Sequence, residues 1–375
     1  MNPERRSMPH IESEDISPQS KISEKGQERR EARVEKEGSL AQKISEWWRG
    51  DAHTHSVEST REGFGYPDGI YDEGEILDYY EKLGLEFVSF AEHASKPGAP
   101  EKQTPEGPIS QALLNQSERV FELNQGDRKI AAFSGVEANI MFDENGEPVI
   151  DIPDEVLGQL DVVVGSRHAI ENEKDPEAIK KSLLAAIRNP NVDVIGHPDR
   201  NSRINKEKSK EYWEKYWGVW PEILDEMEKN KTAFEINLNS VPSKKLLLMA
   251  IKRDIPLFIN YDAHDFGQYK KAAEDQVEST EKGWSAAREW SKDKLSDEDT
   301  EILKDYKLDR LSSGPGVRAI FKLAKMIKML ESRGVTPERV VNSSRDRLVR
   351  FLKDRGKSTK NIEQVIEQVS ARENN

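Results

Sequence analysis

The chain alternates between short runs of apolar residues and longer stretches in which apolar residues recur at helical spacing. Strands are predicted at 49–53, 86–91, 130–136, 161–165, 192–196, 233–238 and 256–261. These runs are continuously apolar rather than alternating, which indicates strands covered on both faces, as in a parallel sheet. The stretches between them are typical of amphipathic helices, for example Ile76, Leu77, Tyr80 and Leu83, which form one face before Gly84.

Seven strands that alternate with helices predict an α/β fold, either a barrel or a doubly wound sheet. The count of seven favours a slightly irregular TIM-like barrel over a regular eight-fold one. Within 47–355, which we predict to be one domain, polar Trp-containing stretches near 200–220 and 265–313 are predicted as helical insertions. The charged segment 1–46 is predicted to be a disordered tail, and 356–375 a helical or disordered extension.

Composition narrows the classes of function. The 375 residues include 57 Lys and Arg against 70 Asp and Glu, a net charge of -13 that disfavours a surface for duplex DNA. No apolar run is long enough to span a membrane and no signal peptide is visible, so we expect a cytoplasmic protein. Cysteine is absent, which excludes disulfides, thiolate metal sites and cysteine nucleophiles.

The histidines are few and unevenly placed. Of the seven, His10 lies in the tail. The other six each lie at or just beyond the end of a predicted strand, and they are His53, His55, His93, His168, His197 and His264. Carboxylates occupy similar positions, namely Asp51, Glu92, Glu137 and Asp262. Because the carboxyl ends of parallel strands meet at one rim of a barrel, we expect these side chains to converge there.

Imidazole and carboxylate groups without thiolates are ligands for Zn²⁺, Mn²⁺ or Fe²⁺. Residues two apart on a strand point to the same side, so His53 and His55 form one inward pair, and Asp262 and His264 another. A single histidine at a strand end is commonly an ordinary polar residue. Six on one rim predict a metal cluster, because six ligands are too many for one tetrahedral ion.

The motifs resemble those of the PHP (polymerase and histidinol phosphatase) domain family, in sequence and in order. They are Asp51-Ala-His53-Thr-His55-Ser, Glu92-His93, Gly135-Val-Glu137-Ala-Asn139, His168, Gly196-His197-Pro and Asp262-Ala-His264. The resemblance extends from about Trp48 to Leu352. The segments 152–157, 189–197 and 336–342 look most like the PHP module of bacterial family-X DNA polymerases. Since no polymerase domain is present, we expect a free-standing relative.

This resemblance implies a distorted seven-stranded β/α barrel with three divalent ions at the rim. His53, His55, Glu137 and Asp262 would hold the first ion, and Glu137 would bridge to a second held by His168 and His197. The third ion would take His93, His264 and one ligand from the loop after His55. For that loop ligand we favour Asp68, with Glu58, Glu62 and Glu73 as alternatives.

Such a site predicts a metal-dependent phosphoesterase, in which a metal-bridging hydroxide attacks a phosphomonoester such as histidinol phosphate or another small phosphorylated substrate. We count Glu137, Asp262 and His264 as catalytic, and Arg200 and Arg167 as candidates for binding the substrate phosphate. Removal of Glu137 or Asp262 is expected to abolish both metal content and turnover.

Several alternatives stay open. The likeness to polymerase modules leaves a 3′-5′ exonuclease or phosphodiesterase acting on single-stranded nucleic acid ends. An amidohydrolase-type hydrolase and a non-catalytic PHP scaffold are more remote, because the expected ligands are in place.

Further residues have two interpretations each. The aromatic stripe Tyr212, Trp213, Tyr216, Trp217 and Trp220 is either local core or a lid. Asn139, Asn237 and Asn239 either line the pocket or form turns. Glu235 is a candidate acceptor for a ligand histidine.

Overall fold

The computed structural model describes residues 43–57, 69–96, 101–168, 175–200, 208–264 and 315–373, with the side chains of 315–321 excepted. The strands are β1 (Gly50–Thr54), β2 (Phe87–Phe90), β3 (Ala131–Phe142), β4 (Pro148–Ile150), β5 (Val162–Ser166), β6 (Val194–Gly196), β7 (Ala233–Asn237) and β8 (Leu257–Asn260). The α-helices are α2 (Glu73–Lys82), α3 (Pro108–Leu123), α4 (Asp154–Leu157), α5 (Pro176–Arg188), α6 (Lys210–Asn230), α7 (Lys244–Ile251), α11 (Pro315–Glu331), α12 (Arg345–Asp354) and α13 (Lys360–Glu373). Two 3₁₀ turns, η3 (Pro337–Arg339) and η4 (Val341–Ser343), precede α12.

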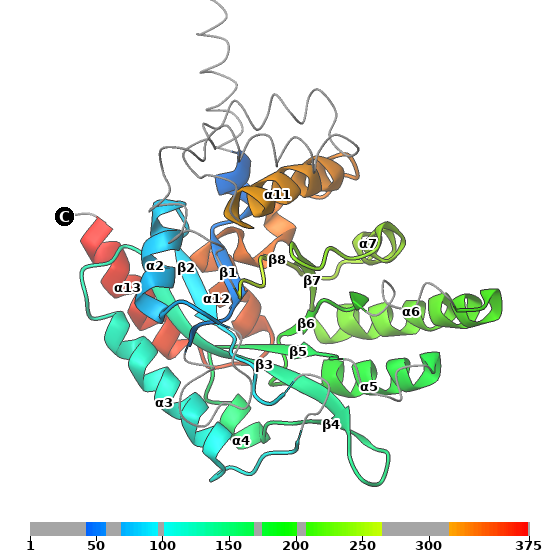
Figure 1. Ribbon diagram of the computed structural model, residues 1–375. Helices are drawn as coiled ribbons and strands as arrows, with labels where there is room; N and C mark the ends of the chain where they lie inside the picture. The colour runs from blue at the N-terminus through cyan, green and yellow to red at the C-terminus, as the bar shows by residue number, and fades with distance from the viewer. Residues whose placement is uncertain are drawn as a thin grey trace, which may run out of the picture.

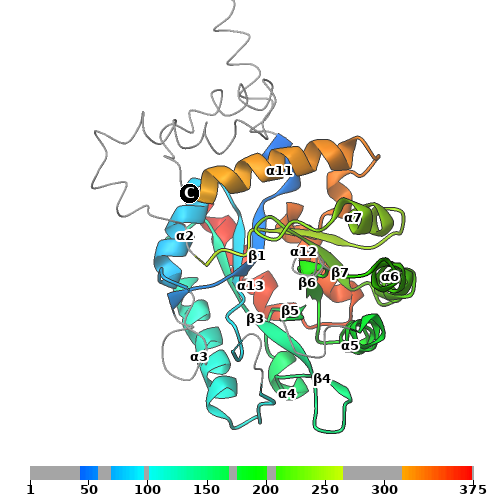
Figure 2. The ribbon, with the colours of Figure 1, turned by 45° about the vertical axis from the view of Figure 1, so that its right-hand side comes forward.

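The strands form a parallel sheet in the order β1-β2-β3-β5-β6-β7-β8. Figures 1 and 2 show it curving round a central axis, with α2, α3, α5, α6 and α7 on its outer side. The first and last strands meet through a parallel bridge between Thr54 and Ala263, where the backbone N–H of His55 donates to the carbonyl of Ala263 at 2.9 Å. The predicted α/β fold class, a distorted β/α barrel, is confirmed.

The junction between β1 and β8 depends on one side chain. Asn342 in η4 is completely buried. Its Nδ2 donates to the carbonyl oxygens of Gly50 on β1, at 2.7 Å, and Ile259 on β8, at 2.5 Å. Its Oδ1 accepts from the backbone N–H of Ile259 at 3.0 Å. The amide therefore supplies the hydrogen bonds that a neighbouring strand would give, and it joins the two edges of the sheet.

Two apolar layers hold the barrel together. The larger lies between the strands and the surrounding helices. The smaller lies inside the barrel, where side chains of the strands contact apolar side chains of α12 and α13. Lys357 and Arg345, from the same C-terminal segment, donate to the carbonyls of Asp161 and Glu86, which immediately precede β5 and β2. The C-terminal helices therefore close the N-terminal end of the barrel, and the opposite end is left for the predicted site.

Replacing Phe351 tests this closure. Its ring, on α12, packs edge-on against Phe258 of β8 at a centroid distance of 5.5 Å, and it is 7% exposed. We expect Phe351→Ala to lower the free energy of unfolding by about 3 kcal/mol, because it leaves a cavity inside the barrel. Urea denaturation measures the effect. Phe121→Ala, at a side chain that is 45% exposed, is the control, and equal losses in the two variants would contradict the closure.

Several predicted elements differ in detail. The third strand extends well beyond the predicted end at 136, because Glu137 to Asn139 still pair with β5 and Ile140 to Phe142 pair with β4 in an antiparallel hairpin. Gly146, with φ of 76°, forms the turn of that hairpin. Thr336, Pro337 and Glu338 have the pattern of a helix start, but only η3 forms there, and α12 begins at Arg345 with Ser344 as its N-cap. Val340 forms a bridge to Leu257 of β8, which interrupts the helix.

The aromatic stripe lies in α6, which connects β6 to β7. Tyr216 and Trp220 are buried in the outer apolar layer, and Tyr212, Trp213 and Trp217 are partly buried against it. Residues 210–220 are thus part of the regular helix layer of the barrel, and the stripe is core. The second predicted insertion and the tail up to residue 42 lie outside the described residues.

At the C-terminus, where the prediction left helix and disorder open, α13 forms a helix packed on the barrel. Within the described ranges, none of the helices combines the length and the apolar character needed to cross a bilayer.

Candidate metal centre

The six predicted histidines and two of the carboxylates converge at the C-terminal rim of the barrel. Glu137, in the middle of β3, has no exposed surface. One of its oxygens, Oε1, lies 2.8 Å from Nε2 of His197 and 3.1 Å from Nε2 of His168. The other, Oε2, lies 2.9 Å from Nδ1 of His93 and 3.3 Å from Nε2 of His53. Glu137 therefore contacts imidazoles from four different segments, as a bridging carboxylate requires.

Asp262 forms a second centre of contacts. Its Oδ1 lies 3.3 Å from Nδ1 of His264, 3.4 Å from Nε2 of His55 and 3.6 Å from Nε2 of His53. Since Glu137 Oε2 is also 3.6 Å from Nε2 of His55, the two carboxylates share imidazole neighbours. The eight side chains therefore form one continuous cluster.

Donor atoms in this cluster are close enough to share ions. Within the described ranges, four groups have ligand atoms within 4.8 Å of one another: His53, His55 and Glu137; His53, His197 and Asp262; His93, Glu137 and His168; and His55, His93 and His264. These groups overlap the ligand sets that the family resemblance implied. They also use only nitrogen and oxygen donors, which suits zinc, manganese or iron.

Unsatisfied polar atoms test whether metal ions fit. In the part of the chain that the structure describes, several buried atoms of the cluster have no hydrogen-bond partner: Nε2 of His53, His55 and His168, Oε2 of Glu137 and Oδ1 of Asp262. Buried polar atoms are normally paired, because an unpaired one costs about 1–3 kcal/mol. Divalent ions would satisfy all five atoms at once, so the residues fit a metal cluster.

The backbone is unusual where these ligands lie. The pairing of β1 with β2 shifts register between Asp51 and Thr54, a bulge-like irregularity in the strand that carries His53. His197, directly after β6, has a φ of 25°, and Asp262, two residues after the end of β8, has a φ of 57°. A residue with a Cβ adopts this left-handed region only when its surroundings impose it. The strand ends are thus shaped by the site rather than by regular sheet geometry.

Neighbouring polar side chains orient the ligand rings. Nδ1 of His53 lies 2.7 Å from Oε1 of Glu235, and Nδ1 of His168 lies 2.6 Å from Oδ1 of Asn139. Because a carboxylate or amide oxygen only accepts, each ring donates through Nδ1 and turns Nε2 towards the cluster. Asn139 is itself fixed by Asp151, to which its Nδ2 donates at 2.7 Å, and burial raises the pKa of Asp151 to about 6.

Sequence reasoning missed Asp151, because it lies just after the unpredicted strand β4. An Asp two residues before Pro153 is an ordinary loop residue by pattern, so only the hairpin with β3 brings it to Asn139.

The contact between Asn139 and His168 leads to a prediction. In Asn139→Ala the His168 ring loses its acceptor, so we expect the affinity for Zn²⁺ to fall about tenfold. Metal retained after dialysis against a weak chelator, measured by inductively coupled plasma mass spectrometry, gives the result. Asn191→Ala, an amide on the α5–β6 connection, is the control. Equal retention in both variants would show that Asn139 does not support the centre.

The electrostatics favour the ligand forms of four side chains of the cluster. His53 differs: burial acts to lower its pKa, but Glu235 and Glu137 outweigh burial and raise that pKa well above its usual value. Burial acts to raise the pKa of Glu137, but His168 and His53 outweigh it and hold that pKa well below its usual range. The same balance, with His53 and His55 as neighbours, lowers the pKa of Asp262. Burial lowers the pKa of His55 to about 3 and that of His168 to about 4. Ionised carboxylates and neutral imidazoles are the forms that bind metal ions.

Two carboxylates near the motif histidines turn away from the cluster. Asp51 accepts a hydrogen bond from the hydroxyl of Tyr80 on α2 at 2.8 Å. Glu92 accepts from the backbone N–H and hydroxyl of Ser56, at 2.9 and 2.6 Å. Both therefore hold the chain around His53 and His55 rather than contributing to the four groups.

The third-ion loop ligand stays a prediction, since Asp68, Glu58 and Glu62 lie outside the described residues. Glu73 is buried in the first turn of α2, 3.8 Å from Nε of Arg119, and belongs to none of the four groups. Gly69 lies against the turn that follows His55, where a Cβ would approach the Ser56 carbonyl oxygen to 2.0 Å. The chain next to Asp68 is therefore packed beside the first histidine pair.

The two predicted phosphate-binding arginines have different surroundings. Arg167 follows β5 directly and is buried beside His168, whereas Arg200 is exposed, and its backbone N–H donates to the carbonyl of His197 at 2.9 Å. Their roles stay predictions.

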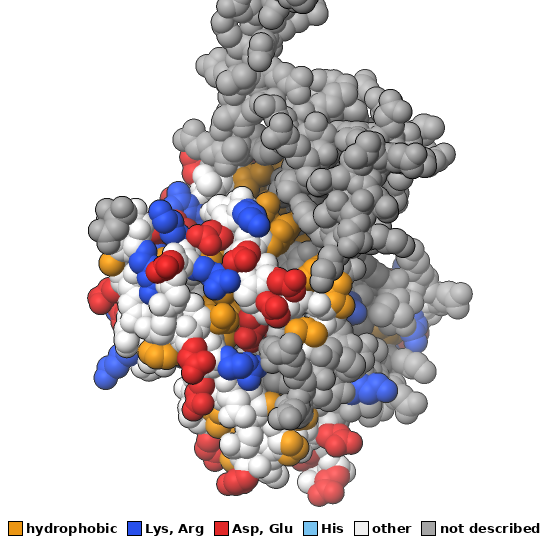
Figure 3. All heavy atoms as spheres, turned by 60° about the vertical axis from the view of Figure 1, so that its left-hand side comes forward, with side chains coloured by type: hydrophobic (Ala, Val, Ile, Leu, Met, Phe, Trp, Pro, Cys, Tyr) orange, Lys and Arg blue, Asp and Glu red, His pale blue; other side chains and the backbone are white. Residues whose placement is uncertain are grey.

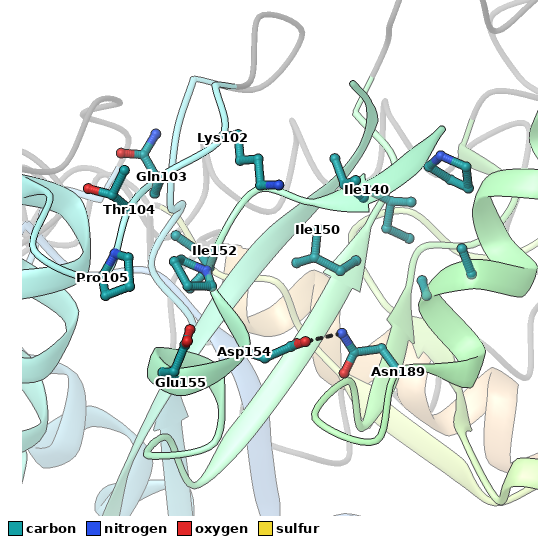
Figure 4. A pocket seen from close by; sticks show the side chains of 15 residues that line it. Lys102, Gln103, Thr104, Pro105, Ile140, Ile150, Ile152, Asp154, Glu155 and Asn189 are labelled. Atoms are coloured by element: carbon teal, nitrogen blue, oxygen red, sulfur yellow. Dashed lines mark hydrogen bonds between the residues drawn. The ribbon is translucent and has the colours of Figure 1, made fainter. Parts of the chain in front are cut away.

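A separate pocket of about 510 Å³ lies between the β3–β4 hairpin, α4 and α5 (Figure 4). Ile140, Ile150 and Ile152 line it, with a hydrogen bond of 2.8 Å between Asp154 and Asn189 at its edge. It contains none of the predicted site residues.

The chain matches no family model. It is 25% identical over 245 residues to the DNA polymerase/3'-5' exonuclease PolX of Bacillus subtilis, covering 64% of this chain and 38% of that protein. It is 33% identical over 151 residues to a probable phosphatase of Caldanaerobacter subterraneus, covering 40% and 51%. A probable phosphatase of Clostridium novyi is 27% identical over 224 residues, covering 57% and 78%. The chain thus spans about half or less of the length of the first two relatives.

Among solved structures, the chain is similar to the histidinol phosphate phosphatase of Lactococcus lactis, in complex with zinc, L-histidinol and phosphate. The identity is 18% and the TM-score 0.38, covering 60% of this chain and 91% of that one. The relatives in sequence, together with the barrel and the converging motifs, confirm the predicted resemblance of this chain to the PHP family.

Proposed function

We propose that the chain is a metal-dependent phosphoesterase that hydrolyses a phosphomonoester of a small molecule. One observation carries the proposal, namely the buried cluster around Glu137. In it five ligand atoms have no hydrogen-bond partner among the described residues: Nε2 of His53, His55 and His168, Oε2 of Glu137 and Oδ1 of Asp262. The relatives described as probable phosphatases support the reaction class.

In this proposal the residues form the three ion sets that the family resemblance implies. His53, His55, Glu137 and Asp262 would hold one ion, Glu137 with His168 and His197 a second, and His93 with His264 a third. Zinc, manganese or iron bound there would supply Lewis acidity, which activates water and neutralises the charge of a phosphate ester.

The charge balance of the metal-loaded cluster favours a phosphate ligand. Among the eight clustered side chains only Glu137 and Asp262 are acidic, so divalent ions at the proposed positions would leave an excess of positive charge that attracts a phosphate dianion. Arg167, buried next to His168, would hold phosphate oxygens through its planar guanidinium, and Arg200 would reach them from the rim. These residues bind and orient the substrate in this proposal.

Phosphate release tests the proposal. Metal-free protein is loaded separately with Zn²⁺, Mn²⁺ or Fe²⁺ and assayed with p-nitrophenyl phosphate, histidinol phosphate and nucleoside monophosphates. We expect release of inorganic phosphate with at least one ion and its loss on chelation. Failure to hydrolyse any phosphomonoester with every ion would refute the proposal.

A second candidate is a 3′-5′ exonuclease acting on single-stranded ends. The match to PolX, which covers 64% of the chain, favours it. The face over α2 and α3 shows basic and acidic side chains interspersed among its described residues (Figure 3). Asp78 of α2, for example, pairs with Arg128 at 3.0 Å. The described residues of that face therefore form no extended basic stripe for nucleic acid. Release of mononucleotides from a labelled single-stranded oligonucleotide, reduced by salt, would favour this second function.

A further inference from the structure

Strand β7 supplies none of the predicted ligands, yet it carries a completely buried carboxylate beside them. Oε1 of Glu235 accepts hydrogen bonds from Nδ1 of His53 at 2.7 Å and Nδ2 of Asn260 at 3.0 Å. Oε2 accepts from the backbone N–H of His197 at 2.5 Å and from Nδ2 of Asn237 at 3.1 Å. A buried carboxylate is unfavourable unless donors surround it. Four donors converge here, from β1, β7, β8 and the end of β6.

The contact with His53 fixes an imidazole of the first ion position. Because Oε1 of Glu235 can only accept, Nδ1 of His53 carries the proton and Nε2 is directed inward. There Nε2 lies 3.3 Å from Oε2 of Glu137 and 3.6 Å from Oδ1 of Asp262. A carboxylate behind a ligand histidine fixes the orientation of the ring and raises its basicity.

The contact with His197 fixes a backbone rather than a ring. His197 has a φ of 25°, and its N–H points to Oε2 of Glu235. That conformation is unfavourable for a residue with a side chain, and the charge-assisted hydrogen bond opposes its relaxation. In this conformation Nε2 of His197 reaches within 2.8 Å of Oε1 of Glu137, at the second ion position.

Asn237 has a similar role two residues further along β7. Its Nδ2 donates to Oδ2 of Asp262 at 2.9 Å, while its Oδ1 accepts from the backbone N–H groups of Asn239 and Ser240 at 2.9 and 2.6 Å. The orientation of the amide is thus fixed. Asp262 is the other predicted ligand with positive φ, at 57°, and the bond to Oδ2 leaves its Oδ1 facing the imidazoles.

We infer that Glu235 and Asn237 are positioning residues of the metal centre, which from one strand without ligands hold His53, His197 and Asp262 on three other segments in the geometry that binds ions. Both strained ligands are tied to β7, and Glu235 links two ion positions. The inference rests on the proposed function, because it assumes that the cluster binds metal ions.

Zinc affinity of the metal-free, full-length protein tests the inference without any substrate. In Glu235→Gln the NH2 group of the amide must face two other donors, whichever way the amide turns. We expect the dissociation constant for Zn²⁺, measured by competition with a chromogenic chelator, to rise about 10–100-fold. Asn237→Ala removes one donor from one ligand, and we expect a rise of about tenfold.

A carboxylate at the opposite end of the barrel provides the control. Asp161 accepts from the backbone N–H and the hydroxyl of Ser134, both at 2.9 Å, so Asp161→Asn makes the same chemical change away from the cluster. We expect it to lower the Tm of the metal-free protein and to leave Zn²⁺ affinity unchanged. If Glu235→Gln and Asn237→Ala also lower the Tm but leave Zn²⁺ affinity unchanged, both residues are only structural and the inference is overturned. Should Glu235→Gln fail to fold, the Zn²⁺ affinity and the Tm of Asn237→Ala alone decide whether the inference holds.

The outcomes separate this inference from the proposed function. Wild-type protein that binds ions but hydrolyses no phosphoester refutes the function alone, and weaker Zn²⁺ binding by the variants then still supports the positioning role. Wild-type protein that hydrolyses phosphoesters, with variants of unchanged affinity, refutes the positioning role alone. A wild-type protein that binds no divalent ion refutes both.

Discussion

Glu137→Gln is expected to abolish phosphoester hydrolysis and to remove most of the bound metal. Glu137 lies within 3.3 Å of four imidazoles and is the residue that the family resemblance makes a bridge between two ions. An amide keeps the volume but loses the charge and one acceptor oxygen. We therefore expect the rate of hydrolysis to fall by about 10²–10³-fold or more, and the number of ions per chain, measured by mass spectrometry, to fall with it.

The matched control is Glu147→Gln, because it makes the same change on an exposed residue of the β3–β4 hairpin that pairs with Lys181 at 3.1 Å. This variant is expected to retain wild-type activity and metal content. Full activity in Glu137→Gln would show that the cluster is not the catalytic centre. Lost activity with a full complement of ions would show instead that Glu137 acts without bridging.

Asn342→Ala is expected to cause the largest loss of stability among the single substitutions proposed. Three backbone groups of β1 and β8 would lose their partner: the carbonyls of Gly50 and Ile259 and the N–H of Ile259. Each buried group left unpaired costs about 1–3 kcal/mol, so we expect the free energy of unfolding to fall by about 3–5 kcal/mol. Chemical denaturation followed by circular dichroism measures the change.

Asn145→Ala, in the exposed turn between β3 and β4, is the control for this substitution and is expected to change stability by less than about 0.5 kcal/mol. Because the edges joined by Asn342 carry His53 and precede Asp262, the Asn342 variant should also bind zinc more weakly. A stability close to that of wild type would mean that backbone pairing, such as the bridge between Thr54 and Ala263, closes the barrel without the amide.

The strands were predictable because burial on both faces leaves a clear signal in the sequence. Six predicted strands match observed ones to within a few residues, and the third was predicted too short. Its outer end was missed because Ile140 to Phe142 pair with β4 in a hairpin and not with a strand of the barrel. Likewise, the segment after Thr336 has the pattern of a helix start, but the bridge of Val340 to β8 decides its conformation. Local patterns miss such cases because the pairing partner lies outside the segment itself.

The candidate site, like the fold, was predictable only in part. The histidines were identifiable because they are rare and each follows a strand, and parallel topology then brings strand ends together. The residues that support these histidines were identifiable only in part: Glu235, Asn139 and Asn237 were candidates by their positions, but others were not recognised. Asp151 and Asn260 resemble ordinary polar residues at strand ends or loops, and their roles depend on partners 12 and 25 residues away, Asn139 and Glu235. In sequence, Asp51 and Glu92 accompany the motif histidines just as Glu137 does. In the structure they accept hydrogen bonds from Tyr80 and Ser56 and belong to none of the four donor groups.

By itself, the sequence determined the fold class, the rim on which the chemistry lies and the donor types of the site, because these follow from the order of strands and the kinds of residue at their ends. The tertiary structure decided which carboxylates enter the cluster, how β1 and β8 close and which side chains orient the ligands. Side-chain direction at a strand end depends on local φ and on hydrogen bonds to distant segments. Glu235 on β7 shows this most clearly: its sequence position made it a candidate acceptor for one ligand histidine, and only the structure shows that it contacts both His53 and His197.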